Sequence, residues 1–288
     1  MTLRVRRALT IVSCVLLGLA LYFAAGSRAG LDKMRKDFVA LRYLQESLAA
    51  VSQRPKDRPL AIAKLTRAIE LAPDSPAIRA TAPQIYVEAG AYATALRLLL
   101  PQGETDPYLL GLCLLELGHT ERATQLLLAT ARAAKDAYSR GETSDAAYAM
   151  QINNVGYLLA DAGLALNEAK AMLETATSTL PLDPNCVDSL GWVHYRLGHY
   201  REAVFFLERA VRHLVPPGQA EVYYHLGAGY AREGRITAAK RMLRAALQQD
   251  PEYEDAIREL ERLNWRLPQP AYTEAGRVAC VDPSCAVP

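Results

Sequence analysis

The sequence predicts an all-α solenoid of about six helix-turn-helix repeats preceded by one transmembrane helix. Two observations predict this architecture. Small and apolar residues recur with a period near 34 residues, and an uncharged apolar run of 18 residues, 8–25, lies close to the N-terminus. A period of 20–50 residues is typical of stacked repeats. An apolar run of this length is long enough to cross a bilayer as a helix.

The composition is that of a globular protein and argues against several functional classes. Of the 288 residues, 51% are apolar and 22% are charged, so the chain has enough apolar surface to bury a core. Residues 31–288 carry 29 basic and 31 acidic side chains and lack the basic excess of a nucleic-acid-binding protein. The five Cys show neither CxxC spacing nor a paired Cys/His pattern. We therefore expect no zinc-finger framework and no nucleic-acid partner.

The apolar run 8–25 is interpreted as an uncleaved signal anchor. As a helix it would rise about 27 Å, close to the hydrocarbon thickness of a bilayer of about 30 Å. Arg4, Arg6 and Arg7 precede it, and the positive-inside rule then predicts a cytoplasmic N-terminus with the rest of the chain periplasmic or extracellular. The alternative is a signal peptide cut within 26–29, which would release a soluble secreted or periplasmic protein.

The repeat is marked first by an Ala and a Leu four residues apart. These pairs are Ala61/Leu65, Ala95/Leu99, Ala123/Leu127, Ala169/Leu173, Ala203/Leu207 and Ala239/Leu243. A Gly after Leu or Val precedes four of the pairs, and a second Gly follows it by seven residues. These glycines are Gly111 and Gly118, Gly156 and Gly163, Gly191 and Gly198, and Gly227 and Gly234.

This pattern resembles the tetratricopeptide repeat, a helix-turn-helix unit of 34 residues, in a membrane-anchored bacterial type of protein. The resemblance covers about 42–251 and is strongest over 149–251. Each marked position has a physical reason. The first Gly lets the two helices of a repeat approach closely, and the second Gly adopts the turn conformation between them. The small Ala leaves room where the helices cross, and a following Pro ends the second helix.

The chain divides into five predicted segments. They are a signal anchor at 1–30, divergent repeats at 31–104, tetratricopeptide repeats at 105–251, a capping helix at 252–263 and a Pro-rich tail at 264–288. In the divergent part Pro83 stands where the packing Gly belongs. A long interval between the third and fourth pairs predicts an insertion at about 132–147, with an extended helix, a loop from Gly141 and a cap at Ser144 or Asp145.

A binding groove is predicted along the first helices of the repeats, because such stacks present these helices on their concave face. Helical periodicity and the resemblance to peptide-binding members of the family place ten side chains there. They are Asn153, Asn154, Tyr157, Asp188, Trp192, Tyr195, Arg196, Tyr224, His225 and Arg232. These residue types suit an extended or helical segment of another protein. We expect Trp192 and Arg196 to share a face, with packing between repeats as the alternative for the aromatic residues and solvated surface for the polar ones.

No catalytic chemistry, cofactor or metal is expected. The sequence has no HExxH and no Gly-x-Ser-x-Gly, and the repeat pattern already explains the glycines at 227–234. The predicted function is a non-enzymatic, membrane-tethered scaffold that binds other proteins, with envelope or secretion-system assembly as a fold-level analogy. The alternatives are a soluble secreted adaptor and a regulatory subunit of an enzyme complex.

The cysteines divide into two groups. Cys280 and Cys285 flank a Val-Asp-Pro-Ser turn, and in an oxidising compartment we expect them to form a disulfide. Two free thiols would be the cytoplasmic alternative. Cys113 on a repeat helix and Cys186 just ahead of one are expected to stay reduced.

Overall fold

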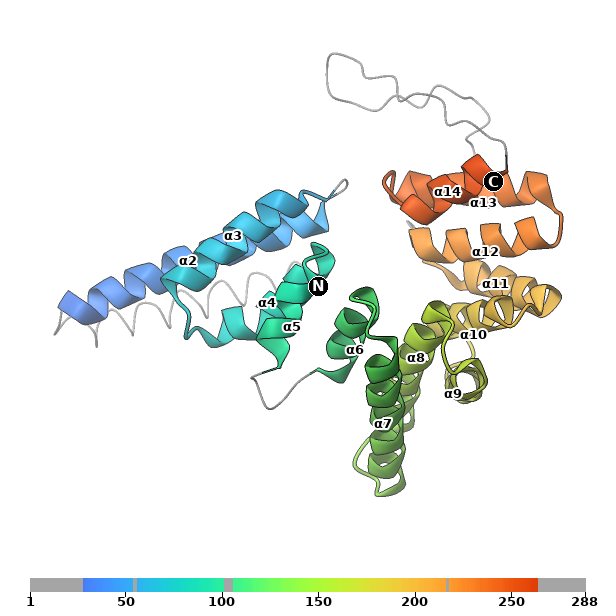
Figure 1. Ribbon diagram of the computed structural model, residues 1–288, viewed down its shortest axis with the longest axis horizontal. Coiled ribbons are helices and arrows are strands. Elements are labelled where there is room, and N and C mark those ends of the chain that lie inside the picture. The colour runs from blue at the N-terminus through green and yellow to red at the C-terminus, as the bar shows by residue number, and fades with distance from the viewer. Residues whose placement is uncertain (1–27, 54–55, 101–105, 216–217, 264–288) are drawn as a thin grey trace, which may run out of the picture. The chain divides into compact units, whose positions relative to one another are not determined.

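The computed structural model describes residues 28–53, 56–100, 106–215 and 218–263. Within these ranges the chain forms thirteen α-helices and no strand, which confirms the all-α prediction (Figure 1). The helices belong to two compact units, Met1–Ala165 and Leu166–Pro288. Each unit is described by itself below.

The first unit consists of consecutive helices that pack against their neighbours in the chain. They are α2 (Arg28–Ser52), α3 (Arg58–Leu71), α4 (Pro76–Glu88), α5 (Tyr92–Leu99), α6 (Pro107–Glu116), α7 (Thr120–Ser139) and α8 (Asp145–Ala162). Helix α2 packs along α3, and α6, α7 and α8 contact one another. Asp residues at the caps start α3 and α6 by accepting hydrogen bonds from the first free backbone amides.

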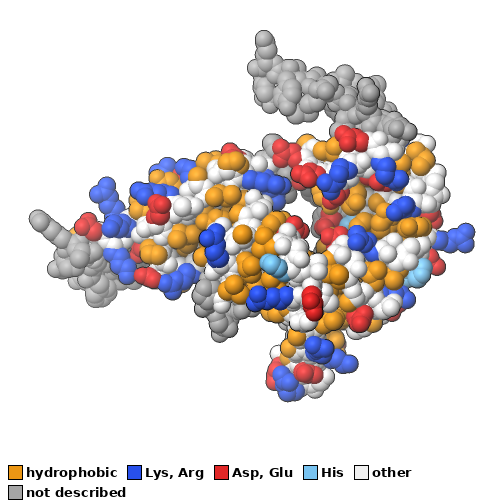
Figure 2. Space-filling view, in the orientation of Figure 1, with side chains coloured by type: hydrophobic (Ala, Val, Ile, Leu, Met, Phe, Trp, Pro, Cys, Tyr) orange, Lys and Arg blue, Asp and Glu red, His pale blue; other side chains and the backbone are white. Residues whose placement is uncertain are grey.

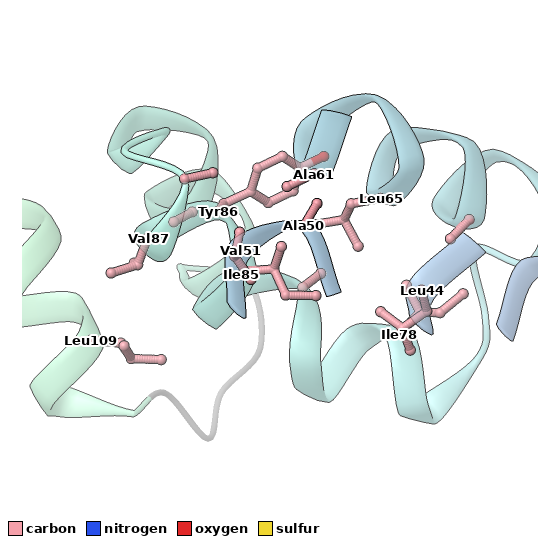
Figure 3. Packing of buried hydrophobic residues seen from close by; sticks show 14 of the residues in the cluster. Leu44, Ala50, Val51, Ala61, Leu65, Ile78, Ile85, Tyr86, Val87 and Leu109 are labelled. Atoms are coloured by element: carbon pink, nitrogen blue, oxygen red, sulfur yellow. The ribbon is translucent and has the colours of Figure 1, made fainter. Parts of the chain in front are cut away.

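The core of the first unit lies where α2, α3 and α4 meet. Leu44 and Ile78 point toward each other, and Ala61 and Leu65 lie in the same cluster (Figure 3). Both members of this first Ala/Leu pair are fully buried, as the repeat pattern predicts. The hydroxyl of Ser47 donates a hydrogen bond of 2.7 Å to the carbonyl of Ala61 and joins α2 to α3.

One feature of the first unit departs from the sequence expectations. Helix α2 has 25 residues and begins at Arg28, so it crosses the boundary drawn at residue 30. Helix α4 contains Pro83, which is buried and does not end the helix. Proline removes one backbone donor, and Pro83 is among the buried residues of α4.

The predicted insertion is confirmed in position and in form. Helix α7 extends over 20 residues to Ser139. Gly141 then takes a left-handed φ of +73°. The Ser144 hydroxyl accepts a hydrogen bond of 3.3 Å from the Ala147 amide and so caps α8.

The second unit repeats the helix pair with more regular lengths. Its helices are α9 (Leu166–Thr179), α10 (Pro184–Arg196), α11 (Tyr200–His213), α12 (Ala220–Arg232), α13 (Ile236–Gln249) and α14 (Glu254–Arg262). Helices α10 and α11 form one close pair, and α12 and α13 form the next. Helix α14 matches the predicted capping helix, because Ala256 and Leu260 bury its apolar face against Leu243 and Ala246.

The packing glycines of the second unit have the predicted role. A Cβ placed on Gly191 would lie 2.7 Å from Leu207 Cγ, and one on Gly227 would lie 2.8 Å from Leu243 Cγ. These are distances that real side chains do not tolerate. The paired helices therefore approach over a bare backbone, and the Leu of each Ala/Leu pair fills the space.

The turns and the cysteines follow from the local sequence. Gly198 takes a φ of +81°, a conformation that L-residues rarely adopt. The Asp183 carboxylate accepts hydrogen bonds of 3.0 Å from the amides of Asn185 and Cys186 and caps α10. Cys186 thus lies inside the first turn of α10, not ahead of it. Cys113 and Cys186 are both buried free thiols.

The membrane and disulfide predictions concern other parts of the chain. None of the helices in the described ranges is both long enough and apolar enough to cross a membrane. The predicted span 8–25 and the pair Cys280 and Cys285 lie outside the described residues. Both remain predictions.

Candidate protein-binding surface

An aromatic ladder runs across the first helices of the second unit. We use this name for six ring-bearing residues in contact, namely Tyr200, Tyr195, Trp192, His225, Tyr224 and Tyr253. They come from α10, α11, α12 and the turn before α14. Four of the six were expected in the groove from the sequence.

Trp192 forms the centre of the ladder and is only 3% exposed. Its ring stacks on Tyr195 with centroids 4.6 Å apart and on His225 with centroids 4.0 Å apart. Helix α12 covers it from the neighbouring repeat. The expectation that Trp192 and the exposed Arg196 present one accessible face is therefore wrong for Trp192, which packs between repeats.

The ends of the ladder are half-buried tyrosines. Tyr195 and Tyr200 meet edge to face with centroids 5.6 Å apart, and Tyr224 and Tyr253 lie 5.5 Å apart. Each of these four rings keeps part of its surface accessible. The ladder thus has a buried centre and accessible ends.

Arg232 lies over one end of the ladder. Its guanidinium carbon is 5.5 Å from the Tyr200 ring centroid and 6.0 Å from that of Tyr195, and its Nε donates a hydrogen bond of 3.4 Å to the Tyr195 hydroxyl. That bond raises the pKa of Arg232, which stays charged. The side chain is exposed and forms no ion pair with a described residue. It is a cation fixed against two rings and open to an anionic group.

Asp188 contacts His225, which is the most buried ring of the ladder. His225 Nδ1 is 2.8 Å from Asp188 Oδ2. His225 is 1% exposed and Asp188 is 5% exposed. The expectation that they line an open groove is wrong. Buried polar groups need partners. Asp188 Oδ2 and His225 Nδ1 partner each other across α10 and α12, whereas Asp188 Oδ1 has no hydrogen-bond partner among the described residues.

Comparison with known proteins identifies the repeat. The tetratricopeptide repeat family model matches residues 188–212 and 220–253, which cover most of α10 to α13. The chain contains tetratricopeptide repeats. The matched segments hold Asp188, Trp192, Tyr195, His225 and Arg232, so the ladder is built on TPR units.

The similarity to known proteins concerns the fold and does not identify an activity. A TPR repeat-containing protein of Pseudomonas aeruginosa is 37% identical over 79 residues, which are 27% of this chain and only 13% of that protein. A tetratricopeptide repeat protein from Parabacteroides merdae superposes with a TM-score of 0.59 at 15% identity, over 86% of this chain and 89% of that one. MamA from Desulfovibrio magneticus RS-1 gives a TM-score of 0.41 at 19% identity, over 63% and 98%. The family-model match and the Parabacteroides merdae superposition together show an all-helical TPR solenoid fold.

Three of the ten predicted groove residues lie on α8, in the other unit. Asn153 is buried, and its Oδ1 has no hydrogen-bond partner among the described residues. Asn154 is exposed and Tyr157 is half-buried. The structure places none of the three on the ladder, and their role in binding stays a prediction.

Tyr200 and Tyr253 are the ladder residues that the sequence rule missed. The rule considered only the first helix of each repeat, whereas Tyr200 opens the second helix α11 and Tyr253 precedes α14. An aromatic residue two positions after the turn glycine Gly198, or after the terminating Pro251, is the signal that finds them. Among the described residues, no group of three or more His, Cys, Asp or Glu side chains could hold a metal ion.

Proposed function

We propose that this chain is a membrane-tethered adaptor whose TPR solenoid binds a segment of a partner protein at the aromatic ladder. One observation carries the proposal: Arg232 lies exposed over Tyr195 and Tyr200 with no carboxylate partner among the described residues. Tyrosine and arginine are enriched among the residues that dominate binding energy. Rings held by Trp192 also lose little side-chain entropy when a partner binds.

The partner segment is expected to combine an apolar side chain with a carboxylate. The half-exposed faces of Tyr195 and Tyr200 offer apolar contact, and Arg232 offers a charge-assisted hydrogen bond. Arg196 lies exposed on the same helix as Tyr195 and adds a second cation. An acidic extended or helical segment fits this chemistry.

Tyr195→Ala combined with Arg232→Ala tests the binding proposal. We expect the double variant to lose specific crosslinked partners from the native membrane and to keep its helical circular dichroism. Arg201→Ala with Arg212→Ala is the matched control, since both arginines are exposed on the second helix α11. Equal recovery of the same partners by both variants would place the binding surface elsewhere.

The membrane tether is supported by the uncharged run 8–25 and by the three Arg before it. We propose a single-pass protein with a cytoplasmic N-terminus and an extracytoplasmic repeat region. Alkaline carbonate extraction distinguishes this anchored form from a cleaved, soluble one. A reporter fused after Pro288 tests the orientation: activity of a strictly cytoplasmic reporter there contradicts it.

The same location predicts a disulfide between Cys280 and Cys285 in the oxidising compartment. Alkylation of the unreduced protein, followed by peptide mass analysis, measures it. A tail peptide that carries two alkyl groups would contradict the bond and weaken the proposed location.

A further inference from the structure

Helix α2 carries a second apolar face that the described chain leaves partly exposed. Leu31, Phe38, Leu41 and Leu48 are 41%, 57%, 42% and 37% exposed. The adjoining side of the helix, which includes Leu44, packs into the core formed with α3. In Figure 2, hydrophobic and basic side chains lie next to one another over the region of α2 and α3. Large exposed side chains in a row mark an interaction surface.

The spacing of this face alternates between three and four residues. Its positions are Leu31, Met34, Phe38, Leu41, Gln45 and Leu48. This is the a and d pattern of a heptad, with Leu31, Phe38 and Gln45 at a. We call these six residues the α2 stripe. Such a stripe fits the matching stripe of another helix by knobs-into-holes packing.

We propose that the α2 stripe pairs with the α2 stripe of a second copy of this chain in a parallel two-stranded coiled coil. The charged residues beside the α2 stripe favour a second copy of this chain as the partner helix. Asp37 falls at a g position and Arg42 at the e position five residues later, so a parallel pair places Asp37 of each copy beside Arg42 of the other.

The opposite orientation is disfavoured by the same charges. An antiparallel pair would set e positions against e positions and would bring Arg35 near Arg42 of the other copy. The polar Gln45 at an a position adds register specificity, because a buried amide is best satisfied by its own counterpart. A shared membrane anchor before α2 would impose the same parallel order, but the charge argument stands without it.

Cysteine crosslinking of the full-length chain, in mild detergent, tests the pairing and its direction. The background carries Cys14→Ser, Cys280→Ser and Cys285→Ser, which leaves the two buried thiols. Leu31→Cys and Gln45→Cys should each form intermolecular disulfides under mild oxidation. Lys36→Cys, exposed on α2 outside the stripe, is the matched control. Equal crosslinking at position 36, or none at 31 and 45, overturns the proposal.

Charge exchange provides an independent test by sedimentation. Asp37→Arg and Arg42→Asp should each weaken self-association, because like charges then meet, and an equimolar mixture of the two variants should restore the dimer. Phe38→Glu should give a monomer with unchanged circular dichroism, since Phe38 is exposed. A monomeric wild-type chain, or a mixture no more associated than either variant alone, overturns the proposal.

Discussion

The imidazole of His225 is held between the Asp188 carboxylate and the indole of Trp192. Its Nδ1 lies 2.8 Å from Asp188 Oδ2, and its ring stacks on Trp192 with centroids 4.0 Å apart. Because Asp188 and Trp192 belong to α10 and His225 to α12, this arrangement fastens two successive repeats. The half-buried tyrosines Tyr195 and Tyr224 of the ladder pack against the Trp192 ring of this arrangement.

The Asp188–His225 interaction should contribute measurably to stability. Asp188→Ala removes the hydrogen-bond partner of a buried imidazole, and we expect a loss of about 1–3 kcal/mol in the free energy of unfolding. His225→Phe keeps the stacking on Trp192 and removes the hydrogen bond. A double-mutant cycle by chemical denaturation should give a coupling of about 0.5–3 kcal/mol, whereas strict additivity would show that the contact contributes nothing.

Two glycines on α12 provide a matched test of helix packing. In Gly227→Ala the new methyl would lie 2.8 Å from Leu243 Cγ, and in Gly229→Ala it would lie 3.1 Å from Val204 Cγ2. We expect Gly227→Ala to lower the free energy of unfolding by about 1–3 kcal/mol. Gly229→Ala should cost less, because its methyl would lie farther from its nearest neighbour, while both variants gain the same helix propensity of about 0.5–1 kcal/mol. Equal melting temperatures for the two variants would contradict this assignment.

The sequence predicts the helical framework well because the constraints of a repeat are local. The Leu of each Ala/Leu pair must fill the space above a packing glycine, so Gly191 and Leu207 occur at a fixed spacing. The turn glycine and the cap at Ser144 likewise depend only on their immediate neighbours. These features can be found without knowledge of tertiary contacts.

Exposure of the groove residues could not be predicted in the same way. Whether Trp192 is buried depends on His225, 33 residues away on the next repeat. Periodicity indicates which side of a helix a residue occupies, but not what the neighbouring helix places on it. The contribution of Tyr200 was missed for a related reason, since it reaches the ladder from a second helix.

The two buried thiols should be unreactive in the folded protein. Burial raises the pKa of Cys113 to about 11 and that of Cys186 to about 12. The thiolate is the reactive form, so neither should be alkylated by iodoacetamide at neutral pH until the chain unfolds. The Cys14→Ser, Cys280→Ser, Cys285→Ser background isolates these two residues for mass analysis. Rapid labelling under native conditions would contradict their placement in the core.

Because His194 is buried, we expect the protein to lose stability in mild acid. Its side chain is buried on α10, stacks on Phe206 with centroids 5.5 Å apart, and has no hydrogen-bond partner for Nδ1 among the described residues. Burial lowers the pKa of His194, and the nearby Lys170 lowers it further. The unfolded chain, with an ordinary His pKa of about 6.5, therefore binds a proton more readily than the folded chain.

The direction of the pKa shift of His194 determines how the stability of the protein changes with pH. Stability from a neutral buried His194 is fully present above about pH 6.5 and is lost as the pH falls below that value, because protonation then favours the unfolded state. His194→Phe keeps the aromatic contact with Phe206 and removes the titrating group. Its free energy of unfolding, measured by urea titration, should fall less between neutral pH and pH 5 than that of the wild type. If His194→Phe kept the full acid sensitivity of the wild type, other groups would be responsible for it.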